Sequence, residues 1–338
     1  MRTSHTAEVE APQVGARRIF NLISTELGLV EEEFERQARS NIQVIAYLGD
    51  YLRVSGGKRV RPALTLLSVY GVGGDASRYN AIRMATVMEF LHTATLVHDD
   101  VIDNAVTRRN RPSINSRFGN QTAVLMGDWL YMSAFETSLA ERSLPVLDIL
   151  TAVTRKMTEG ELLQLTLLGR TDITEEQYFE VLERKTAYLF SACCEIGAIL
   201  GSATADEQAA LREYGMNLGT AFQLVDDLLD FTATDEVLGK PAGLDLVEGK
   251  LTLPLIYLLE EEPRLAARVQ TVMREGNYEQ VTREELLEAV LKTGAMERAR
   301  RRASEFSTQA RDALDRLPDS EYCDALRSIP TYIIERES

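Results

Sequence analysis

Residues 91–109, LHTATLVHDDVIDNAVTRR, hold three aspartates that follow a nearly unbroken apolar run and precede two adjacent arginines. If this run is helical, residues three and four positions apart lie on or near one face, so Asp99, Asp100 and Asp103 project into one arc at the helix C-terminal end. That end carries the negative pole of the helix dipole, so three carboxylates there need a compensating positive charge. Mg²⁺, which proteins hold between one or two carboxylates and substrate phosphates, would supply that charge. The stretch therefore predicts a divalent metal site at the end of a helix.

A second copy of the same spacing supports this prediction. Residues 223–231, QLVDDLLDF, contain Asp226, Asp227 and Asp230, again after an apolar stretch. One such triplet is weak evidence, because solvated loops and helix ends carry it by chance. Two copies, each at the end of an apolar helix, favour two helix ends that hold metal ions together.

Composition indicates a globular chain without a membrane span. The 338 residues are 45% hydrophobic and 26% charged, and the apolar runs are far shorter than a membrane span needs. The net charge of −15 disfavours nucleic acid as a partner, since nucleic-acid binding needs a basic surface. Residues 1–18 lack the apolar core of a signal peptide, so we expect a flexible arm there and one domain over residues 19–338. Cys193, Cys194 and Cys323 lack the spacing of a disulfide framework, which fits a cytoplasmic location.

Most of the chain is predicted to be helical, and no segment shows the alternating polarity of a strand. Helices are predicted over residues 19–52 (two segments), 62–70, 79–103, 121–141, 144–168, 205–231 and 251–260, with another starting near 172–174. The segment 79–103 is apolar nearly all round, which marks a buried central helix. The basic run 298–302 is interpreted as solvated surface. The sequence therefore predicts an all-α fold.

Three further features could balance the negative charge of an anionic substrate. Residues 55–62, SGGKRVRP, combine two glycines, which let a ligand approach the backbone closely, with three cations, although a charged interhelical loop explains them equally well. The glycine-rich loop 238–250 carries two lysines, Lys240 and Lys250. His92 lies seven positions before Asp99 and so on nearly the same helix face, which favours a ligand role, whereas His98 is interpreted as a core residue.

Taken together, these motifs resemble the trans-isoprenyl diphosphate synthase family, and in particular its long-chain members, the hexa- to decaprenyl diphosphate synthases. The segments GGKRVRP, LHTATLVHDDVIDNAVTRR, GELLQ, KT, QLVDDLLDF and GKPAGLDLVEGKLTLP occur in the order typical of that family, within residues 52–259. The resemblance implies a single large bundle of antiparallel helices around a central cavity, usually in a homodimer. It also implies a reaction. An allylic diphosphate such as geranyl or farnesyl diphosphate ionises, the double bond of isopentenyl diphosphate attacks the cation, and loss of a proton completes the longer chain.

The same resemblance implies roles for individual residues. The ligands of about three Mg²⁺ ions would be Asp99 and Asp103 with Asp100 in support, and Asp226 with Asp227 and Asp230. Contacts to the allylic diphosphate would come from Arg108, Lys185, Thr186, Gln223, Lys240 and Lys250. The isopentenyl diphosphate site would contain Gly57, Lys58, Arg61, His92 and Arg109. The expected catalytic residues are Asp99, Lys185, Gln223, Asp226 and Lys240, and the departing pyrophosphate is expected to take the proton. The basic tail of some relatives is replaced here by Arg336, Glu337 and Ser338, which leaves a closing role for the tail open.

Product length depends on where the cavity ends. Ala94 and Thr95, one helical turn before Asp99, are small, whereas short-chain relatives place a bulky aromatic residue at one of these positions. A deeper floor would then be formed by Met88, Trp129, Tyr131 or Phe135. We therefore expect a product of about C30–C50 for a quinone side chain, with geranylgeranyl diphosphate as the alternative.

Three other classes of protein fit the sequence less well. Class I terpene cyclases share the first aspartate motif but usually carry a different second one. A non-catalytic partner subunit of a prenyl synthase complex would lose aspartates or the GGKRxRP motif, and this chain keeps both. A purely structural bundle would not need lysines and aspartates together at the ends of apolar helices.

Overall fold

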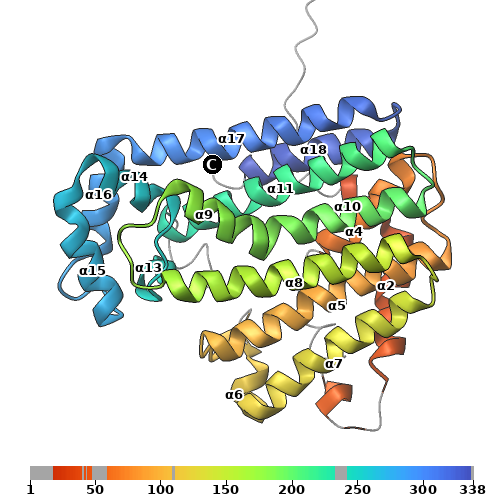
Figure 1. Ribbon diagram of the computed structural model, residues 1–338, viewed down its shortest axis with the longest axis horizontal. Helices are drawn as coiled ribbons and strands as arrows, with labels where there is room; N and C mark the ends of the chain where they lie inside the picture. Colours follow the sequence, from red (N-terminus) through yellow and green to blue (C-terminus); the bar gives the residue numbers. More distant parts are fainter. Residues whose placement is uncertain are drawn as a thin grey trace, which may run out of the picture.

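The computed structural model describes residues 18–39, 42, 44–47, 59–108, 111–232 and 242–335, and they form a bundle of helices (Figure 1). The long helices are α2 (Ser24–Gln37), α4 (Val60–Gly71), α5 (Tyr79–Ile102), α7 (Asn120–Leu139), α8 (Leu144–Leu167), α10 (Tyr188–Leu200), α11 (Ala205–Thr232), α17 (Ala295–Ala313) and α18 (Glu321–Glu335). Shorter helices are α6 (Ile114–Phe118), α9 (Glu175–Leu182), α13 (Leu244–Val247), α14 (Leu253–Glu261), α15 (Ala266–Glu275) and α16 (Arg283–Thr293). A π-helix, η1 (Glu183–Ala187), joins α9 to α10, and two 3₁₀ turns, η2 (Pro263–Leu265) and η3 (Leu314–Arg316), complete the set.

The predicted all-α fold is confirmed, with one small exception. Strands β1 (Thr107–Arg108) and β2 (Arg111–Pro112) form an antiparallel pair of two residues each. Two-residue strands are too short to show alternating polarity, so the sequence could not reveal them. The pair follows the first aspartate motif and includes Arg108, so it helps to hold that side chain near the end of α5.

Helix α5, which carries the first aspartate motif, is buried along most of its length, as its all-round apolar sequence predicts. It packs against α2, α4 and α7. Phe90 is inaccessible to solvent and meets the ring of Phe34 of α2 at a centroid distance of 4.4 Å. Burying one such side chain stabilises the fold by roughly 2–3 kcal/mol, so α5 is fixed firmly within the bundle.

Helix α11, which carries the second motif, lies unusually close to the helices before it. A Cβ at Gly215 would lie 2.6 Å from the carbonyl oxygen of Phe190, and one at Gly219 would lie 2.7 Å from Cα of Ala187. Glycines spaced four apart therefore let the α11 backbone approach α10 and η1 directly. The C-terminal ends of α5 and α11 both point toward the end of the bundle where α13 lies (Figure 1).

Helix α9 starts where the sequence predicts. The hydroxyl of Thr174 accepts from the backbone N–H of Gln177, and the Gln177 side chain accepts from the N–H of Thr174, which completes a capping box. Glu175 in the first turn pairs with Arg302 of α17 at 3.1 Å and with Arg298 at 3.5 Å. The interpretation of residues 298–302 as solvated surface is therefore wrong for these two arginines, because an acidic partner on α9 draws them into an interhelical contact.

Several other sequence predictions concern residues that the structure does not describe. The described residues exclude the predicted arm except Arg18, the tail 336–338, and the segment 48–58, which includes the first half of the SGGKRVRP motif. Within the described part of the chain, no helix is both long and apolar enough to cross a lipid bilayer.

Candidate active site

The leading aspartates of the two motifs face the same cavity. This cavity has a volume of about 570 Å³ and lies among α4, α5, α7, α8, η1, α10 and α11. Its lining includes the predicted site residues Arg61, His92, Thr95, Asp99, Arg108, Lys185, Thr186, Gln223 and Asp226. Four predicted residues, Gly57, Lys58, Arg109 and Lys240, lie outside the described residues.

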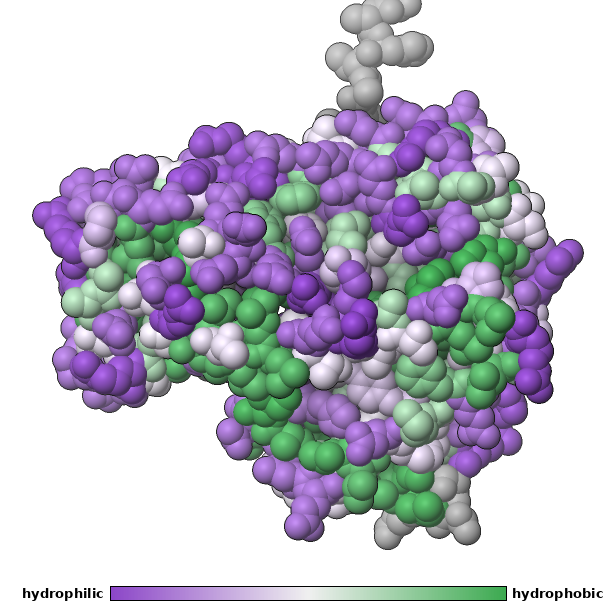
Figure 2. Space-filling view, viewed as in Figure 1, coloured by the Kyte–Doolittle hydropathy of each residue, from purple (hydrophilic) through white to green (hydrophobic). Residues whose placement is uncertain are grey.

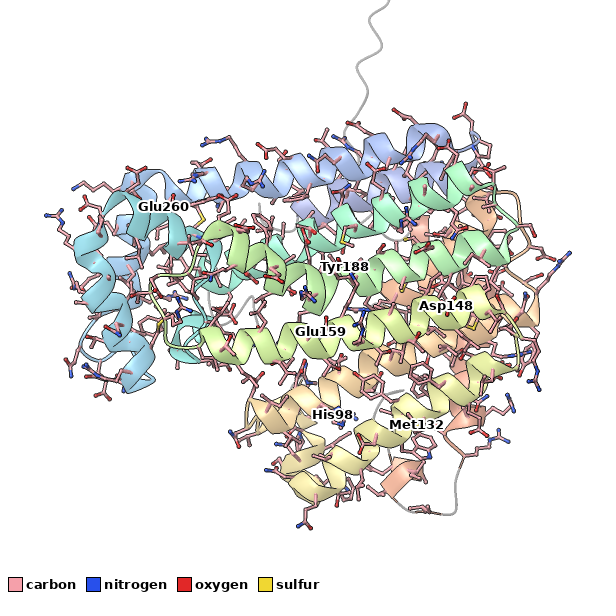
Figure 3. The ribbon with its side chains drawn as sticks, viewed as in Figure 1. His98, Met132, Asp148, Glu159, Tyr188 and Glu260 are labelled. Atoms are coloured by element: carbon pink, nitrogen blue, oxygen red, sulfur yellow. The ribbon has the colours of Figure 1, made fainter. Side chains whose placement is uncertain are left out.

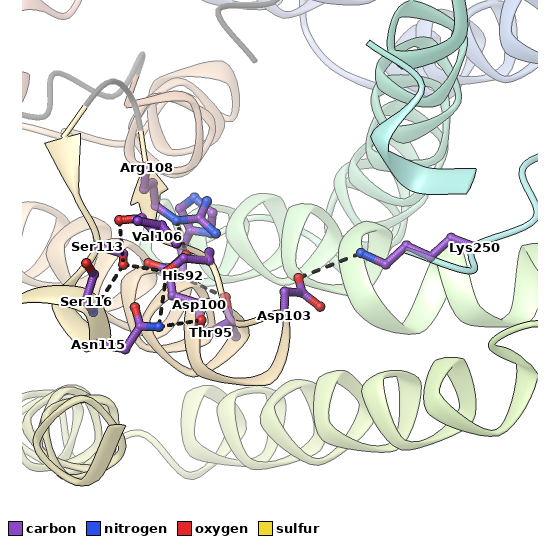
Figure 4. Close-up of polar contacts among 11 residues, drawn as sticks. His92, Thr95, Asp100, Asp103, Val106, Arg108, Ser113, Asn115, Ser116 and Lys250 are labelled. Carbon is purple, nitrogen blue, oxygen red and sulfur yellow. Dashed lines mark hydrogen bonds and ion pairs between the residues drawn. The ribbon is translucent and has the colours of Figure 1, made fainter. Parts of the chain in front are cut away.

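The three aspartates of the first motif occupy different environments. Asp99 is half-buried and lines the cavity, whereas Asp100 is only 2% exposed and accepts a hydrogen bond from Nε of Arg108 at 2.7 Å (Figure 4). Asn115 donates to the Asp100 carbonyl oxygen at 2.9 Å. Asp103 is exposed just beyond the last turn of α5, and its carboxylate lies 3.7 Å from Nζ of Lys250 (Figure 4). Only Asp99 of the three lines the cavity.

In the second motif, too, only the leading aspartate lines the cavity. Asp226 lines the cavity, while Asp227 is buried and accepts from Tyr178 at 2.6 Å and from Gln223 at 2.8 Å. Asp230 is also buried, and its carboxylate accepts from the backbone N–H of Asp245 at 3.1 Å. This last contact ties the second motif to the loop that leads to Lys250.

Lys185 and Thr186 reach the cavity from the π-helix η1. Single π turns inside α-helices are frequent at functional sites. Gly160 of α8 permits this geometry, since a Cβ there would lie 2.7 Å from Cβ of Arg184 and 3.0 Å from the backbone nitrogen of Lys185. Nζ of Lys185 pairs with Glu161 at 2.7 Å. The sequence analysis located both residues but not the π turn that presents them.

Another part of the cavity lining carries the residues expected to bind a second anion. Arg61 and His92 both line it, and the Arg61 guanidinium lies 5.0 Å from the ring centroid of Phe190. Arg59, to which the sequence analysis gave no role, has a φ of 48° and pairs with Glu89 at 2.7 Å and also with Glu31. This left-handed backbone, held by two carboxylates, fixes the start of α4 next to the cavity.

Part of the predicted chain-length region lines the cavity. Thr95 lines the cavity, as do Tyr131 of α7 and Met157 of α8, whereas Ala94 is fully buried away from it. Of the other floor candidates, Met88 is fully buried in the core, whereas Trp129 and Phe135 are partly buried and pack against it; none of the three lines the cavity. His98, interpreted as a core residue, is half-buried; its Nε2 lies 3.0 Å from the Val124 carbonyl oxygen, and the residue also lines the cavity (Figure 3).

The charged side chains of the site are arranged as the binding of a cation would require. Burial raises the pKa of Asp99 to about 6, Lys185 and Arg108 oppose this, and the neighbouring carboxylates of Glu161 and Asp103 raise it further. At Lys250, burial alone would lower the pKa, but Asp103 and Glu248 outweigh it and the pKa is raised. Within the described ranges, no three acidic, histidine or cysteine side chains converge on one point. Asp99 and Asp226 present carboxylate oxygens, the type of ligand that Mg²⁺ takes, to the same cavity.

Comparisons with known proteins agree with this geometry. A family model described as polyprenyl synthetase matches residues 42–290. Octaprenyl diphosphate synthase of Escherichia coli (strain K12) is 39% identical over 321 residues, which cover 95% of this chain and 98% of that protein. The crystal structure of a decaprenyl diphosphate synthase from Rhodobacter capsulatus aligns with a TM-score of 0.89 at 34% identity, over 96% of this chain and 99% of that one. That of polyprenyl synthase from Caulobacter crescentus CB15, complexed with calcium and isoprenyl diphosphate, aligns with a TM-score of 0.89 at 33% identity, over 96% and 98% of the two chains. The chain belongs to the polyprenyl synthetase family and is a trans-prenyltransferase.

Proposed function

We propose that this chain is a Mg²⁺-dependent synthase that condenses isopentenyl diphosphate with an allylic diphosphate to make an all-trans polyprenyl diphosphate of about C30–C50. The observation that carries the proposal is the single cavity lined by Asp99 and Asp226 together with Arg61, His92 and Lys185. The similarity to octaprenyl and decaprenyl diphosphate synthases supports a long product.

Asp99 and Asp226 would hold Mg²⁺, with Asp103 and Asp230 completing the set, for about three ions at the site. When bound, Mg²⁺ neutralises the negative charge that develops on the departing diphosphate. The calcium and isoprenyl diphosphate in the related Caulobacter structure support a site of this chemistry. We propose Asp100 and Asp227 as supports rather than direct ligands, because each is buried and bonded to a neighbouring side chain.

The cavity's polar residues would act on the diphosphates. Arg108, Lys185, Thr186, Gln223, Lys240 and Lys250 would bind the allylic diphosphate and would stabilise the charge that forms on it as the carbon–oxygen bond breaks. Gly57, Lys58, Arg61, His92 and Arg109 would hold isopentenyl diphosphate so that its double bond meets the allylic carbon. The pyrophosphate released would then take the proton, so no side chain is needed as a base.

The apolar part of the cavity would receive the growing chain and keep water from the cation. Thr95 is small and lines the cavity together with Tyr131 and Met157 from other helices. A small side chain at Thr95 and a fully buried Ala94 leave the first turn above Asp99 open. This supports a product longer than geranylgeranyl diphosphate.

We also propose that the chain is a homodimer and that the contact includes α7. Large apolar side chains are exposed on or just after α7, among them Leu125 at 67%, Met132 at 61% and Leu144 at 73%. Figure 2 shows apolar surface over α8 and part of α7, and Figure 3 places Met132 on the viewed face of α7. A cytoplasmic location is proposed because all three cysteines are buried and none is in a disulfide.

Replacement of Asp99 or Asp226 by Ala tests the function. Each variant should lose product formation by at least about a hundredfold while its circular dichroism stays that of the wild type. Asp148, an exposed residue of α8, provides the control: Asp148→Ala should keep full activity. A non-catalytic partner subunit, the other candidate, would show no activity alone and no effect of Asp99→Ala or Asp226→Ala on the activity it supports in a complex.

A further inference from the structure

We propose that Tyr178 is a positioning residue for the reaction: acting through Asp227, it fixes the orientation of Gln223 and Thr186 at the allylic diphosphate subsite. This inference rests on the proposed function, since it concerns the diphosphate that the subsite would bind. Tyr178 lies on α9 and does not line the main cavity. It lines a smaller pocket together with Lys185, Thr186 and Gln223, and its hydroxyl is linked to Gln223 through Asp227.

A continuous chain of hydrogen bonds joins Tyr178 to the cavity. The Tyr178 hydroxyl donates to Oδ2 of Asp227 at 2.6 Å, and Nε2 of Gln223 donates to Oδ1 of the same carboxylate at 2.8 Å. The Thr186 hydroxyl donates to Oε1 of Gln223 at 2.9 Å. Tyr178 and Asp227 are each 8% exposed, so water competes weakly with these bonds.

The Asp227 carboxylate determines which groups donate and which accept in this series of hydrogen bonds. Ionised Asp227 can only accept, so the Gln223 amide must turn its nitrogen toward Asp227 and its oxygen toward Thr186. The amide nitrogen has a second N–H, which a diphosphate oxygen could accept. Asp227 can hold this orientation only if it is itself fixed, and the bond from Tyr178 to its other oxygen does so.

Tyr178 is in turn held by a rigid helix. The capping box at Thr174 closes the start of α9, and Glu175 is paired with Arg298 and Arg302 of α17. At the other end, α9 continues directly into η1, which carries Thr186. The tyrosine and the threonine are thus set on one continuous helical segment, and both reach α11 through Gln223 and Asp227.

The first motif shows the same design with a different partner. Asp100 occupies the position that Asp227 has in the second motif, is buried, and accepts from Arg108 instead of from a tyrosine and a glutamine. In both motifs the leading aspartate lines the cavity and the middle one bonds a polar side chain of the cavity wall. This parallel supports a positioning role for the middle carboxylates and for Tyr178, which holds one of them.

Tyr178→Phe removes one hydroxyl and tests the proposal. We expect kcat/KM for the allylic diphosphate to fall about tenfold, with KM for isopentenyl diphosphate unchanged, because one hydrogen bond to a charged group is lost on one side of the cavity. The Kd of inorganic pyrophosphate with Mg²⁺, measured by calorimetry, should rise by a similar factor. Tyr214→Phe is the matched control: Tyr214 is fully buried on α11 and donates to the Leu326 carbonyl oxygen at 2.8 Å. It should lower the melting temperature and leave both readouts unchanged.

A double-variant cycle separates positioning from packing. In an Asp227→Asn background, Tyr178→Phe should cause little further change in the pyrophosphate Kd, because its effect passes through Asp227. Equal effects of Tyr178→Phe in both backgrounds, or an unchanged Kd in the single variant, would overturn the positioning role. A wild-type protein that made no prenyl product would instead refute the proposed function, and the pyrophosphate Kd ratios would still decide the role of Tyr178.

Discussion

Some residues that serve the reaction lower the stability of the folded protein, and Asp99 is the clearest case. Its pKa is raised from 3.8 to about 6, chiefly by burial. The folded state therefore binds the Asp99 proton more tightly than the unfolded chain does, and the ionised carboxylate destabilises the folded protein. The destabilisation is complete above pH 6 and disappears as the pH falls toward 3.8. A bound divalent cation would offset it.

Asp99→Asn should therefore inactivate the enzyme and stabilise the metal-free protein. At pH 7 the gain should be on the order of 1 kcal/mol, or roughly 1–2 degrees in melting temperature for a chain of 338 residues. The gain should shrink as the pH is lowered from 6 to 4, which thermal melts in the presence of a chelator would measure. Asp148→Asn, at an exposed position, is the control and should not change the melting temperature. A variant less stable than the wild type at pH 7 would show that Asp99 stabilises the fold.

At the scale of elements, the site depends on how closely three helices meet around η1. The α11 backbone approaches at Gly215 and Gly219, and α8 approaches at Gly160. These contacts place Lys185 and Thr186 between the two aspartate motifs. The site is therefore sensitive to volume added at positions that touch no substrate.

Gly160→Ala should displace η1 and lower activity. The added Cβ would meet the backbone nitrogen of Lys185 at 3.0 Å, and backbone cannot rotate away as a side chain can. We expect a loss of about 1–3 kcal/mol in stability and a fall in kcat, measured by denaturant unfolding and steady-state kinetics. At Gly28 on α2, a Cβ would meet nothing within 4 Å, so Gly28→Ala should leave kcat unchanged and slightly stabilise the helix. If Gly160→Ala and Gly28→Ala had the same kcat, the close approach of α8 to η1 would not matter for activity.

At the scale of the whole molecule, the exposed apolar residues of α7 predict a subunit contact. Leu125→Lys should shift the protein from dimer toward monomer in light scattering, because a charge would be buried without a partner. Leu291 is 55% exposed on α16, and Leu291→Lys should leave the dimer intact. A wild-type protein that is a monomer at micromolar concentration would refute the dimer.

Sequence reasoning reached the global architecture but not the direction of individual side chains. Hydrophobic periodicity and capping residues sufficed for α5, α8 and the start of α9, because those signals are local. The motif spacing could not separate Asp99 from Asp100, since a burial difference between adjacent residues depends on which helices pack on each side. The π turn at Lys185 and the left-handed backbone of Arg59 likewise arise from contacts with Gly160, Glu31 and Glu89, which lie far away in sequence.

The most direct test of the account is the length of the product. Purified protein would be incubated with Mg²⁺, isopentenyl diphosphate and either geranyl or farnesyl diphosphate, and the dephosphorylated products sized by chromatography. We predict a dominant product of about C30 or longer, and a shorter one for Thr95→Phe, which would place a ring in the cavity above Asp99. A wild-type product that stops at about C15–C20 would contradict the open cavity at Thr95, and absence of any elongation would contradict the function itself.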